Sequence, residues 1–216
     1  MKPRTLDHVA LWVEDRGAMA EAAARIGLRS IERTDRFTLL GADARRGKLT
    51  LFDAPGSDGA ARRERGPLER IGLRVSALDG RDPIVDLGEG LELVLVEADT
   101  ESELDLDHVA LVSADPAAAA RQWQALGFSA EEDGRLMVGG AWLELRQGDP
   151  GSADRSLLNH LGVLVDSVAE QQAEVEALGV EIADFVDAPN TLALFVRGPD
   201  GVKLEYIEHK PSFSLT

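Results

Sequence analysis

An alternation of apolar and polar residues, typical of a strand with one buried face, occurs twice in the chain in identical form. Residues 6–11 and residues 106–111 both read Leu-Asp-His-Val-Ala-Leu. Looser versions of this strand occur at 158–163 and at 68–73. Two identical hexamers one hundred positions apart indicate an internal duplication. We therefore predict four related units, each of which opens with one of these strands.

A helix pattern and three short strand patterns follow the opening strand of the first unit. Asp15 occupies an N-cap position, the segment 18–26 is rich in alanine, and Gly27 follows it as a helix stop. The strand patterns lie at 29–33, 36–40 and 48–53. The first unit is therefore predicted to fold as βαβββ.

The third unit repeats this order, whereas the second one is degenerate. Asp115 and Pro116 begin an alanine-rich helix in the third unit, and Gly127 follows its end. In the second unit, residues 76–83 are too few and contain too many helix-breaking residues to form a helix. Its final strand, at 91–95, is intact. We therefore expect the second unit to lack its helix.

The fourth unit is the most complete of the four. A helix is predicted at 168–178, with Asp166 as the expected N-cap and Gly179 as the stop. Further along, the turn Pro-Asp-Gly at 199–201 predicts a hairpin that leads into the last strand, at 202–207. The pattern of the whole chain is therefore that of an α+β protein.

Composition and charge narrow the class of partner. The chain of 216 residues carries a formal net charge of -16, which opposes binding to the phosphate backbone of a nucleic acid. It contains no cysteine, so disulfides and thiolate metal sites are excluded. It shows neither a signal-peptide pattern nor an apolar run of about 18 residues. We expect a soluble, cytoplasmic protein whose partner is a small molecule, and neither a nucleic acid nor a membrane.

Residues with metal-binding chemistry lie in the opening and closing strands of the third and fourth units. The period of two places His108 and His160 opposite the apolar side of their strands, and Glu144 and Glu205 can share their face. Two imidazoles with one or two carboxylates form a site suited to Fe2+, Mn2+, Ni2+ or Zn2+. Open coordination positions would bind two neighbouring substrate oxygens. Taken singly, each residue can also be the polar side of an alternating strand.

The first two units offer a comparison within the chain. His8 is kept there, but Arg70 stands at the second histidine position and Thr50 at the first glutamate position. Glu92 remains, and Arg70 can neutralise it in place of a metal ion. We therefore expect metal binding only in the second half of the chain and a structural or vestigial role for His8.

With these residues, the sequence resembles the vicinal oxygen chelate superfamily, which includes glyoxalase I, bleomycin resistance proteins and extradiol dioxygenases. Its most specific motif, Phe-Val-Arg-Gly-Pro-Asp-Gly-Val-Lys-Leu-Glu-Tyr at 195–206, is similar to the closing hairpin of that superfamily. The resemblance implies units that pair into two curved, half-open mixed sheets, with helices outside and a metal ion in the cup between paired units. The simplest pairing gives an N-terminal domain at 1–97 and a C-terminal domain at 104–210, and exchange across the halves or between chains is the alternative.

The resemblance also assigns roles to single residues. His108, His160 and Glu205 match the two-histidine, one-carboxylate triad of the extradiol enzymes, and Glu144 matches the additional ligand of glyoxalase I. Either Glu144 or Glu205 would move the substrate proton. The candidate substrate contacts are Trp142, Arg146, Asn190 and Phe195.

Three functions follow from the resemblance. The first is a divalent-metal-dependent enzyme of the glyoxalase, epimerase or lyase type that acts on a small molecule with neighbouring oxygens. The second is an extradiol ring-cleaving dioxygenase-like enzyme, although Phe195 stands where its tyrosine is expected, and Asn190 or Trp142 near its expected additional histidine. The third is a metal-free protein that sequesters a small molecule such as a drug. Both a monomer and a homodimer are compatible with each function.

Overall fold

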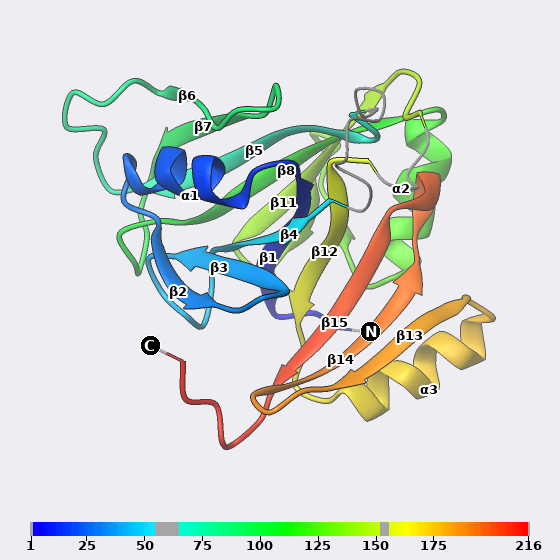
Figure 1. Cartoon of the computed structure of the whole chain (residues 1–216). Coiled ribbons are helices and arrows are strands. Elements are labelled where there is room, and N and C mark those ends of the chain that lie inside the picture. The colour runs from blue at the N-terminus through cyan, green and yellow to red at the C-terminus, as the bar shows by residue number, and fades with distance from the viewer. Residues whose placement is uncertain (1, 55–64, 152–155, 216) are drawn as a thin grey trace.

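The described residues of the protein form two mixed β-sheets and three α-helices. The computed structural model describes residues 2–54, 65–151 and 156–215. Within them, four units follow one another along the chain, and the second unit has strands but no helix (Figure 1). Neither sheet closes into a barrel. The expected α+β architecture of four related units, with a degenerate second one, is therefore confirmed.

The larger sheet has eight strands, which come from the first and fourth units. Its order from edge to edge is β13 (Ile182–Asp187), β14 (Thr191–Arg197), β15 (Lys203–His209), β12 (Leu158–Leu164), β1 (Thr5–Val13), β4 (Lys48–Asp53), β3 (Phe37–Gly41) and β2 (Arg29–Arg33). The two units meet where β1 pairs antiparallel with β12.

The smaller sheet has seven strands, which come from the second and third units. Its order is β6 (Ile84–Asp86), β7 (Glu92–Glu97), β5 (Leu68–Val75), β8 (Asp105–Ser113), β11 (Ala141–Gln147), β10 (Leu136–Val138) and β9 (Ser129–Ala130). Here the two units meet where β5 pairs antiparallel with β8. In both sheets, the opening strands of two units are therefore the central pair.

The observed pairing of units differs from the expected one. We expected the first unit to pair with the second and the third with the fourth, in domains at 1–97 and 104–210. Instead, the first unit pairs with the fourth and the second with the third, so each sheet draws strands from both halves of the chain. The physical reason is that alternation specifies which face of a strand is buried but not which strand lies beside it. The identical hexamers in β1 and β8 make the two choices of partner indistinguishable.

Helices α1 (Arg16–Ala24) and α2 (Pro116–Ala125) begin where the sequence signals place them. The side chain of Asp15 accepts a hydrogen bond from the backbone N–H of Ala18. Asp115 caps α2 by the equivalent bond. These caps satisfy backbone donors that the first turn of a helix leaves unpaired.

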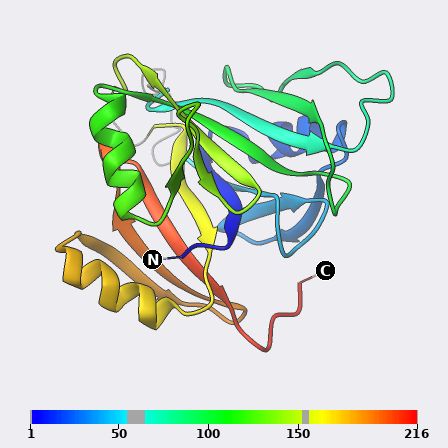
Figure 2. The same ribbon diagram turned by 180° about the vertical axis from the view of Figure 1, so that it is seen from behind.

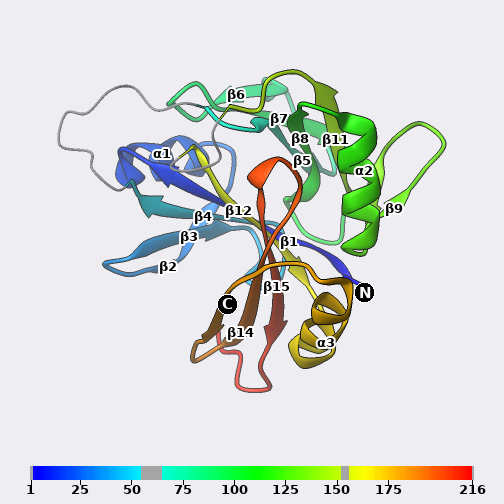
Figure 3. The same ribbon diagram turned by 90° about the vertical axis from the view of Figure 1, so that its right-hand side faces the viewer.

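Helix α3 (Val168–Leu178) begins after Ser167 and not after the expected cap, Asp166. The Ser167 hydroxyl accepts a hydrogen bond from the backbone N–H of Glu170, which makes Ser167 the N-cap. Gly179 ends the helix in the left-handed conformation, with φ 67°. Figure 3 shows α3 against the strands of the fourth unit. Seen from behind, α2 and α3 stand one above the other on the same side of the molecule (Figure 2).

Apolar side chains from both sheets form one continuous core. In β1, the side chains of Val9 and Leu11 are completely buried, and β1 also contacts β8 and β11 of the smaller sheet. This leaves the alternate residues of β1 to face the other side of the larger sheet. None of the described helices has the length and apolar character needed to span a bilayer.

Tyr206 ties the last strand of the larger sheet to the end of α2. Its side chain is completely buried, and its hydroxyl donates a hydrogen bond of 2.8 Å to the backbone carbonyl of Leu126. We predict that Tyr206→Phe lowers the free energy of unfolding by about 1–2 kcal/mol, because this bond is lost while the ring stays packed. Chemical denaturation measures the change. Equal stability of the two proteins would contradict the prediction.

Candidate metal centre

Three polar side chains converge in the larger sheet: His8 on β1, His160 on β12 and Glu205 on β15. The strand register brings them together, because Gly162 of β12 lies opposite both His8 and Glu205. His160 lies two residues before Gly162 and therefore points to the same face. All three side chains are buried. They come from the first and fourth units, so the cluster depends on the pairing of these units.

The donor atoms of the three side chains form a nearly equilateral triangle. The Nε2 atoms of His8 and His160 lie 2.9 Å apart. Oε2 of Glu205 lies 3.0 Å from Nε2 of His8 and 2.8 Å from Nε2 of His160. Across residues 2–54, 65–151 and 156–215, this is the one group of three or more His, Asp or Glu side chains placed to hold a metal ion.

The donor set and its spacing fit a divalent metal ion. Metal–nitrogen bonds are about 2.1 Å long, and two such bonds at a right angle separate their donor atoms by about 3.0 Å. The edges of the triangle match this separation, so the three atoms can occupy one face of an octahedron. A face of two imidazoles and one carboxylate leaves the remaining positions open, as in the triad typical of non-haem Fe(II) oxygenases.

Neighbouring acceptors orient both imidazoles toward the centre of the cluster. Nδ1 of His8 lies 2.8 Å from Oδ2 of Asp7, and Nδ1 of His160 lies 3.0 Å from Oδ1 of Asn159. Because both neighbours are hydrogen-bond acceptors, they favour a proton on Nδ1 and direct Nε2 toward the metal position. The residue before each histidine therefore fixes the orientation of its ring.

Glu205 and the two histidines shift one another's pKa values in the cluster. Burial would raise the pKa of Glu205, but the charges of His8 and His160 and their hydrogen bonds lower it to about 2. Burial would lower the pKa of His8, but Glu205 and Asp7 raise it to about 9. Burial lowers the pKa of His160. Without an ion, the proton on His8 thus balances the charge of Glu205.

A glycine beside His8 makes room for its ring. A Cβ atom at Gly162 would lie only 2.2 Å from Cε1 and 2.4 Å from Nδ1 of His8. The smaller sheet repeats this packing, since a Cβ at Gly72 would lie 2.3 Å from the same two ring atoms of His108. In both sheets, a histidine ring therefore covers a glycine of the neighbouring strand.

The structure brings together two of the four expected metal ligands. His160 and Glu205 lie in the cluster, but His108 and Glu144 lie in the smaller sheet, on β8 and β11. The third member of the cluster is His8, for which a structural or vestigial role was expected. The difference follows from the pairing of units, which places β1, and not β8, beside β12.

Among its described residues, the smaller sheet lacks such a cluster because other residues stand at the corresponding positions. The strand registers match His108 with His8, Arg70 with His160, Val94 with Glu205, and Glu144 with Thr50. Arginine and valine thus replace two of the three donors. The expected correspondence of Glu92 with Glu205 does not hold, because the register places Val94 there and Glu92 is exposed.

Glu144 forms ion pairs with two arginines. Arg70 donates to it at 3.2 Å and Arg146 at 2.9 Å. Burial would raise the pKa of Glu144, but Arg146 and Arg70 lower it. The expected pairing of Arg70 with Glu92 is therefore replaced by one with Glu144.

Of the four expected substrate contacts, only Phe195 lies against the cluster. Its ring meets that of His160 edge-on, with centroids 5.2 Å apart. Trp142 stacks on His108 in the smaller sheet, where Arg146 also lies. Asn190 precedes β14 at its opposite end and accepts a hydrogen bond from the backbone N–H of Ser214.

An aromatic row next to the cluster was not anticipated. The ring of Phe52 lies 6.3 Å from that of His160, and Trp12 and Phe37 lie 5.4 and 6.0 Å from Phe52. Period-two alternation already placed Trp12 on the face of His8, but nothing in the sequence joined Phe37 and Phe52 to them. The parallel pairing of β1 with β4 places Phe52 beside Trp12, and the antiparallel pairing of β3 with β4 places Phe37 beside Phe52.

Part of the chain matches a known protein family. Residues 105–206 match the Glyoxalase/Bleomycin resistance protein/Dioxygenase superfamily. No curated protein sequence matches the chain.

Solved structures share the fold over nearly the whole chain. Glyoxalase I from Zea mays has a TM-score of 0.73 at 15% identity, with 94% of this chain and 92% of that chain covered. A putative dioxygenase from Bacillus subtilis has a TM-score of 0.72 at 15% identity, covering 98% and 87%. The cppA protein from Streptococcus pneumoniae has a TM-score of 0.63 at 15% identity, covering 96% and 98%. At such identities the likeness shows the fold alone. Together, the match of residues 105–206 and this fold bear out the expected resemblance to the vicinal oxygen chelate superfamily.

Proposed function

We propose that the protein is a divalent-metal-dependent enzyme and that His8, His160 and Glu205 hold the ion. The observation that carries this proposal is the buried triangle of donor atoms, with edges of 2.8, 2.9 and 3.0 Å. The substrate is a small molecule with two neighbouring oxygens, which a bound ion would coordinate. The fold of the superfamily supports a metal-dependent enzyme for small molecules in general.

The ligand set favours an oxygen-dependent reaction of the dioxygenase type, with Fe(II) or Mn(II) as the ion. Thr50 occupies the position that Glu144 has in the smaller sheet, so the larger sheet offers one carboxylate at the cluster. In a glyoxalase-type reaction, a second carboxylate at this position would serve as an additional ligand or as the proton-transferring base. A threonine at this position does not supply one.

The aromatic row favours a substrate with a flat, apolar body. Phe52 and Phe195 both lie against the ring of His160, and Trp12 extends the row away from the cluster. Aromatic side chains exclude water and pack against planar rings in offset or edge-on geometry. A catechol-type substrate combines such a body with two neighbouring oxygens.

The side chains of the cluster have separate tasks in this proposal. A bound divalent ion would act as a Lewis acid on the substrate oxygens. Glu205 stays ionised and supplies the negative charge of the site. His8 gives up its Nε2 proton on metal binding, and Asp7 keeps the Nδ1 proton in place.

A second candidate is a reaction of the glyoxalase, epimerase or lyase type, and one observation favours it. Among the described residues, His108 lies in the smaller sheet, and neither His209 nor Tyr206 is directed at the cluster. Nε2 of His209 lies 3.4 Å from Asp7, and Tyr206 donates to the Leu126 carbonyl. A proton transfer by Glu205 would require no further acid–base group from the protein.

We predict that the protein binds one Fe(II) or Mn(II) ion per chain and that His8→Ala lowers the affinity more than about a hundredfold, since even contacts behind a ligand contribute 10- to 100-fold. His108→Ala is the matched control, because it removes the same residue from the same hexamer in the other sheet, and it should leave the affinity unchanged. Calorimetric titration of the metal-free proteins measures both. A loss of affinity with His108→Ala, and none with His8→Ala, would overturn the site assignment.

The two glycines provide a second matched pair. Gly162→Ala would push the His8 ring out of place, so we predict at least about a tenfold loss of metal affinity. Gly72→Ala should displace His108 in the same way and cost similar stability, about 1–3 kcal/mol, without changing metal affinity. Metal titration and denaturation of both variants test this. Equal metal affinity for the two variants would refute it.

The reaction type is tested by oxygen consumption. We predict that the Fe(II)-loaded protein consumes oxygen with catechol-type substrates and that His8→Ala abolishes this activity. An oxygen electrode measures the rate, with the metal-free protein as the blank. If the Fe(II)-loaded protein consumes no oxygen but isomerises hemithioacetals or epimerises a substrate carbon, the glyoxalase, epimerase or lyase type replaces the dioxygenase type. If the wild-type protein binds no metal but retains small aromatic molecules, it is a binding protein.

A further inference from the structure

A buried polar group lies behind His8, on the side away from the proposed metal position. Its centre is the completely buried carboxylate of Asp7, which lies 2.8 Å from Nδ1 of His8. The ammonium group of Lys48 lies 3.0 Å from each of the two carboxylate oxygens. Nε2 of His209 lies 3.4 Å from Oδ1. Asp7 therefore connects the histidine ring to two further groups.

Lys48 is the unusual member of this group. It stands on β4 directly opposite His8 of the parallel strand β1, and only 4% of the residue is exposed. Its Nζ atom also donates to the backbone carbonyl of Ala44 at 2.9 Å. Burying an ammonium and a carboxylate costs several kcal/mol per ion before their attraction offsets it. An apolar pair would fill this space at a smaller cost, so stability alone does not explain the ion pair.

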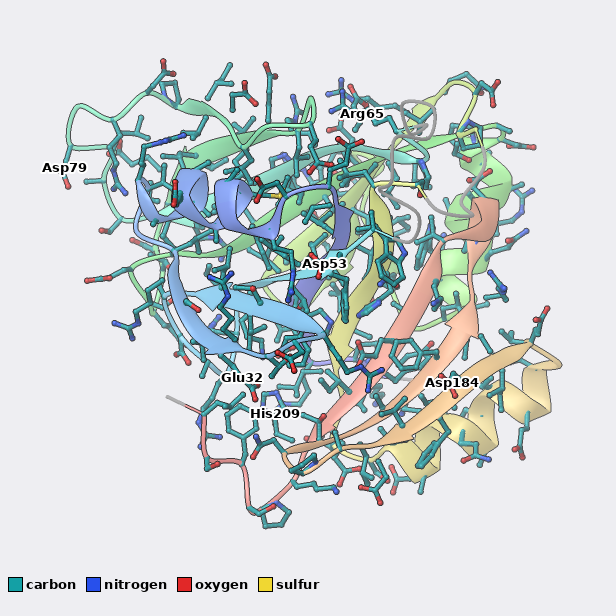
Figure 4. The ribbon with its side chains drawn as sticks, viewed as in Figure 1. Glu32, Asp53, Arg65, Asp79, Asp184 and His209 are labelled. Atoms are coloured by element: carbon teal, nitrogen blue, oxygen red, sulfur yellow. The ribbon has the colours of Figure 1, made fainter. Side chains whose placement is uncertain are left out.

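Lys48, which is itself held by the Ala44 carbonyl, fixes the orientation of the Asp7 carboxylate. With one ammonium in contact with both oxygens, rotation of the carboxylate would break an ion-pair contact. His209 contacts the same carboxylate and stacks on Phe213, with ring centroids 4.3 Å apart. Figure 4 shows His209 between the end of β15 and the C-terminal segment. Asp7 is thus held from two sides, by β4 and by the end of β15.

The smaller sheet contains a related group with a different cation. Asp107 lies 2.8 Å from Nδ1 of His108, and Nε of Arg74 lies 3.2 Å from Asp107. At the position of Lys48, the smaller sheet has Trp142. Arg74 and Asp107 therefore form a comparable ion pair next to a histidine that, among the described residues, belongs to no metal cluster, and this pair serves as an internal control.

We propose that Lys48 is a positioning residue of the metal centre, which acts through Asp7 to hold the His8 ring with Nε2 directed at His160 and Glu205. The inference rests on the proposed metal-binding function. It assigns the integrity of the site to a residue that touches neither the ion nor the substrate. Contacts behind metal ligands commonly contribute 10- to 100-fold to metal affinity.

A double-mutant cycle tests the inference. Lys48→Met and Asp7→Asn should each lower Mn(II) affinity about tenfold, and the double variant should bind no more weakly than Asp7→Asn alone, because Lys48 acts through Asp7. Arg74→Met should leave Mn(II) affinity unchanged. Calorimetric titration gives the affinities, and thermal unfolding gives the stability of each variant. Lys48→Gln, which keeps a donor for Asp7, should lose less affinity than Lys48→Met and replaces it if that variant does not fold.

A readout without metal separates positioning from general stability. In the metal-free protein, the Nδ1 proton of His8 should exchange with solvent faster in Lys48→Met than in wild type, as followed by NMR, and Arg74→Met should leave it unchanged. Unchanged affinity in Lys48→Met, or a loss that adds fully to that of Asp7→Asn, would overturn the inference while the metal site stands. Failure of the wild-type protein to bind Mn(II) would instead remove the proposed function and the inference with it.

Discussion

The antiparallel contact between β1 and β12 is the constraint on which the site depends. It places His8 beside His160 and, because β15 runs next to β12, brings Glu205 to both. The corresponding contact between β8 and β5 gives His108 an arginine and a valine as neighbours. The same hexamer thus contributes to two different environments. The neighbouring strands, and not the histidine itself, decide which chemistry each environment supports.

Each sheet compensates the negative charge of a glutamate, Glu144 or Glu205, in a different way. Glu144 in the smaller sheet carries its counter-charges within the chain, as Arg70 and Arg146. Glu205 in the larger sheet contacts the imidazoles of His8 and His160, and its charge raises the pKa of His8 to about 9. A proton is a replaceable counter-charge, whereas an arginine is not. This difference makes the larger sheet suited to exchange its proton for an ion.

Much of the local structure could be predicted from the sequence, because capping residues, glycine stops and period-two alternation act over a few residues. His160 and Glu205 could be assigned to one face for the same reason. The partner of His160 could not, since β1 and β8 contain identical hexamers and alternation does not identify a neighbouring strand. Lys48 was missed because its role depends on the parallel register of β1 and β4. That register places Lys48 opposite His8, which lies 40 positions earlier in the chain, and no short sequence motif indicates such a pairing.

Along the chain, the two units of the smaller sheet lie between the two units of the larger sheet, and this order has a consequence for biosynthesis. The second and third units are consecutive, so the smaller sheet can complete its pairing once β11 has left the ribosome. Strand β1, by contrast, is made first and must wait for β12, and His8 and His160 are separated by 152 positions. Non-local pairing of this kind is slow and leaves an unpaired strand edge exposed meanwhile. The amino-terminal unit is therefore the part of the nascent chain most in need of protection from aggregation.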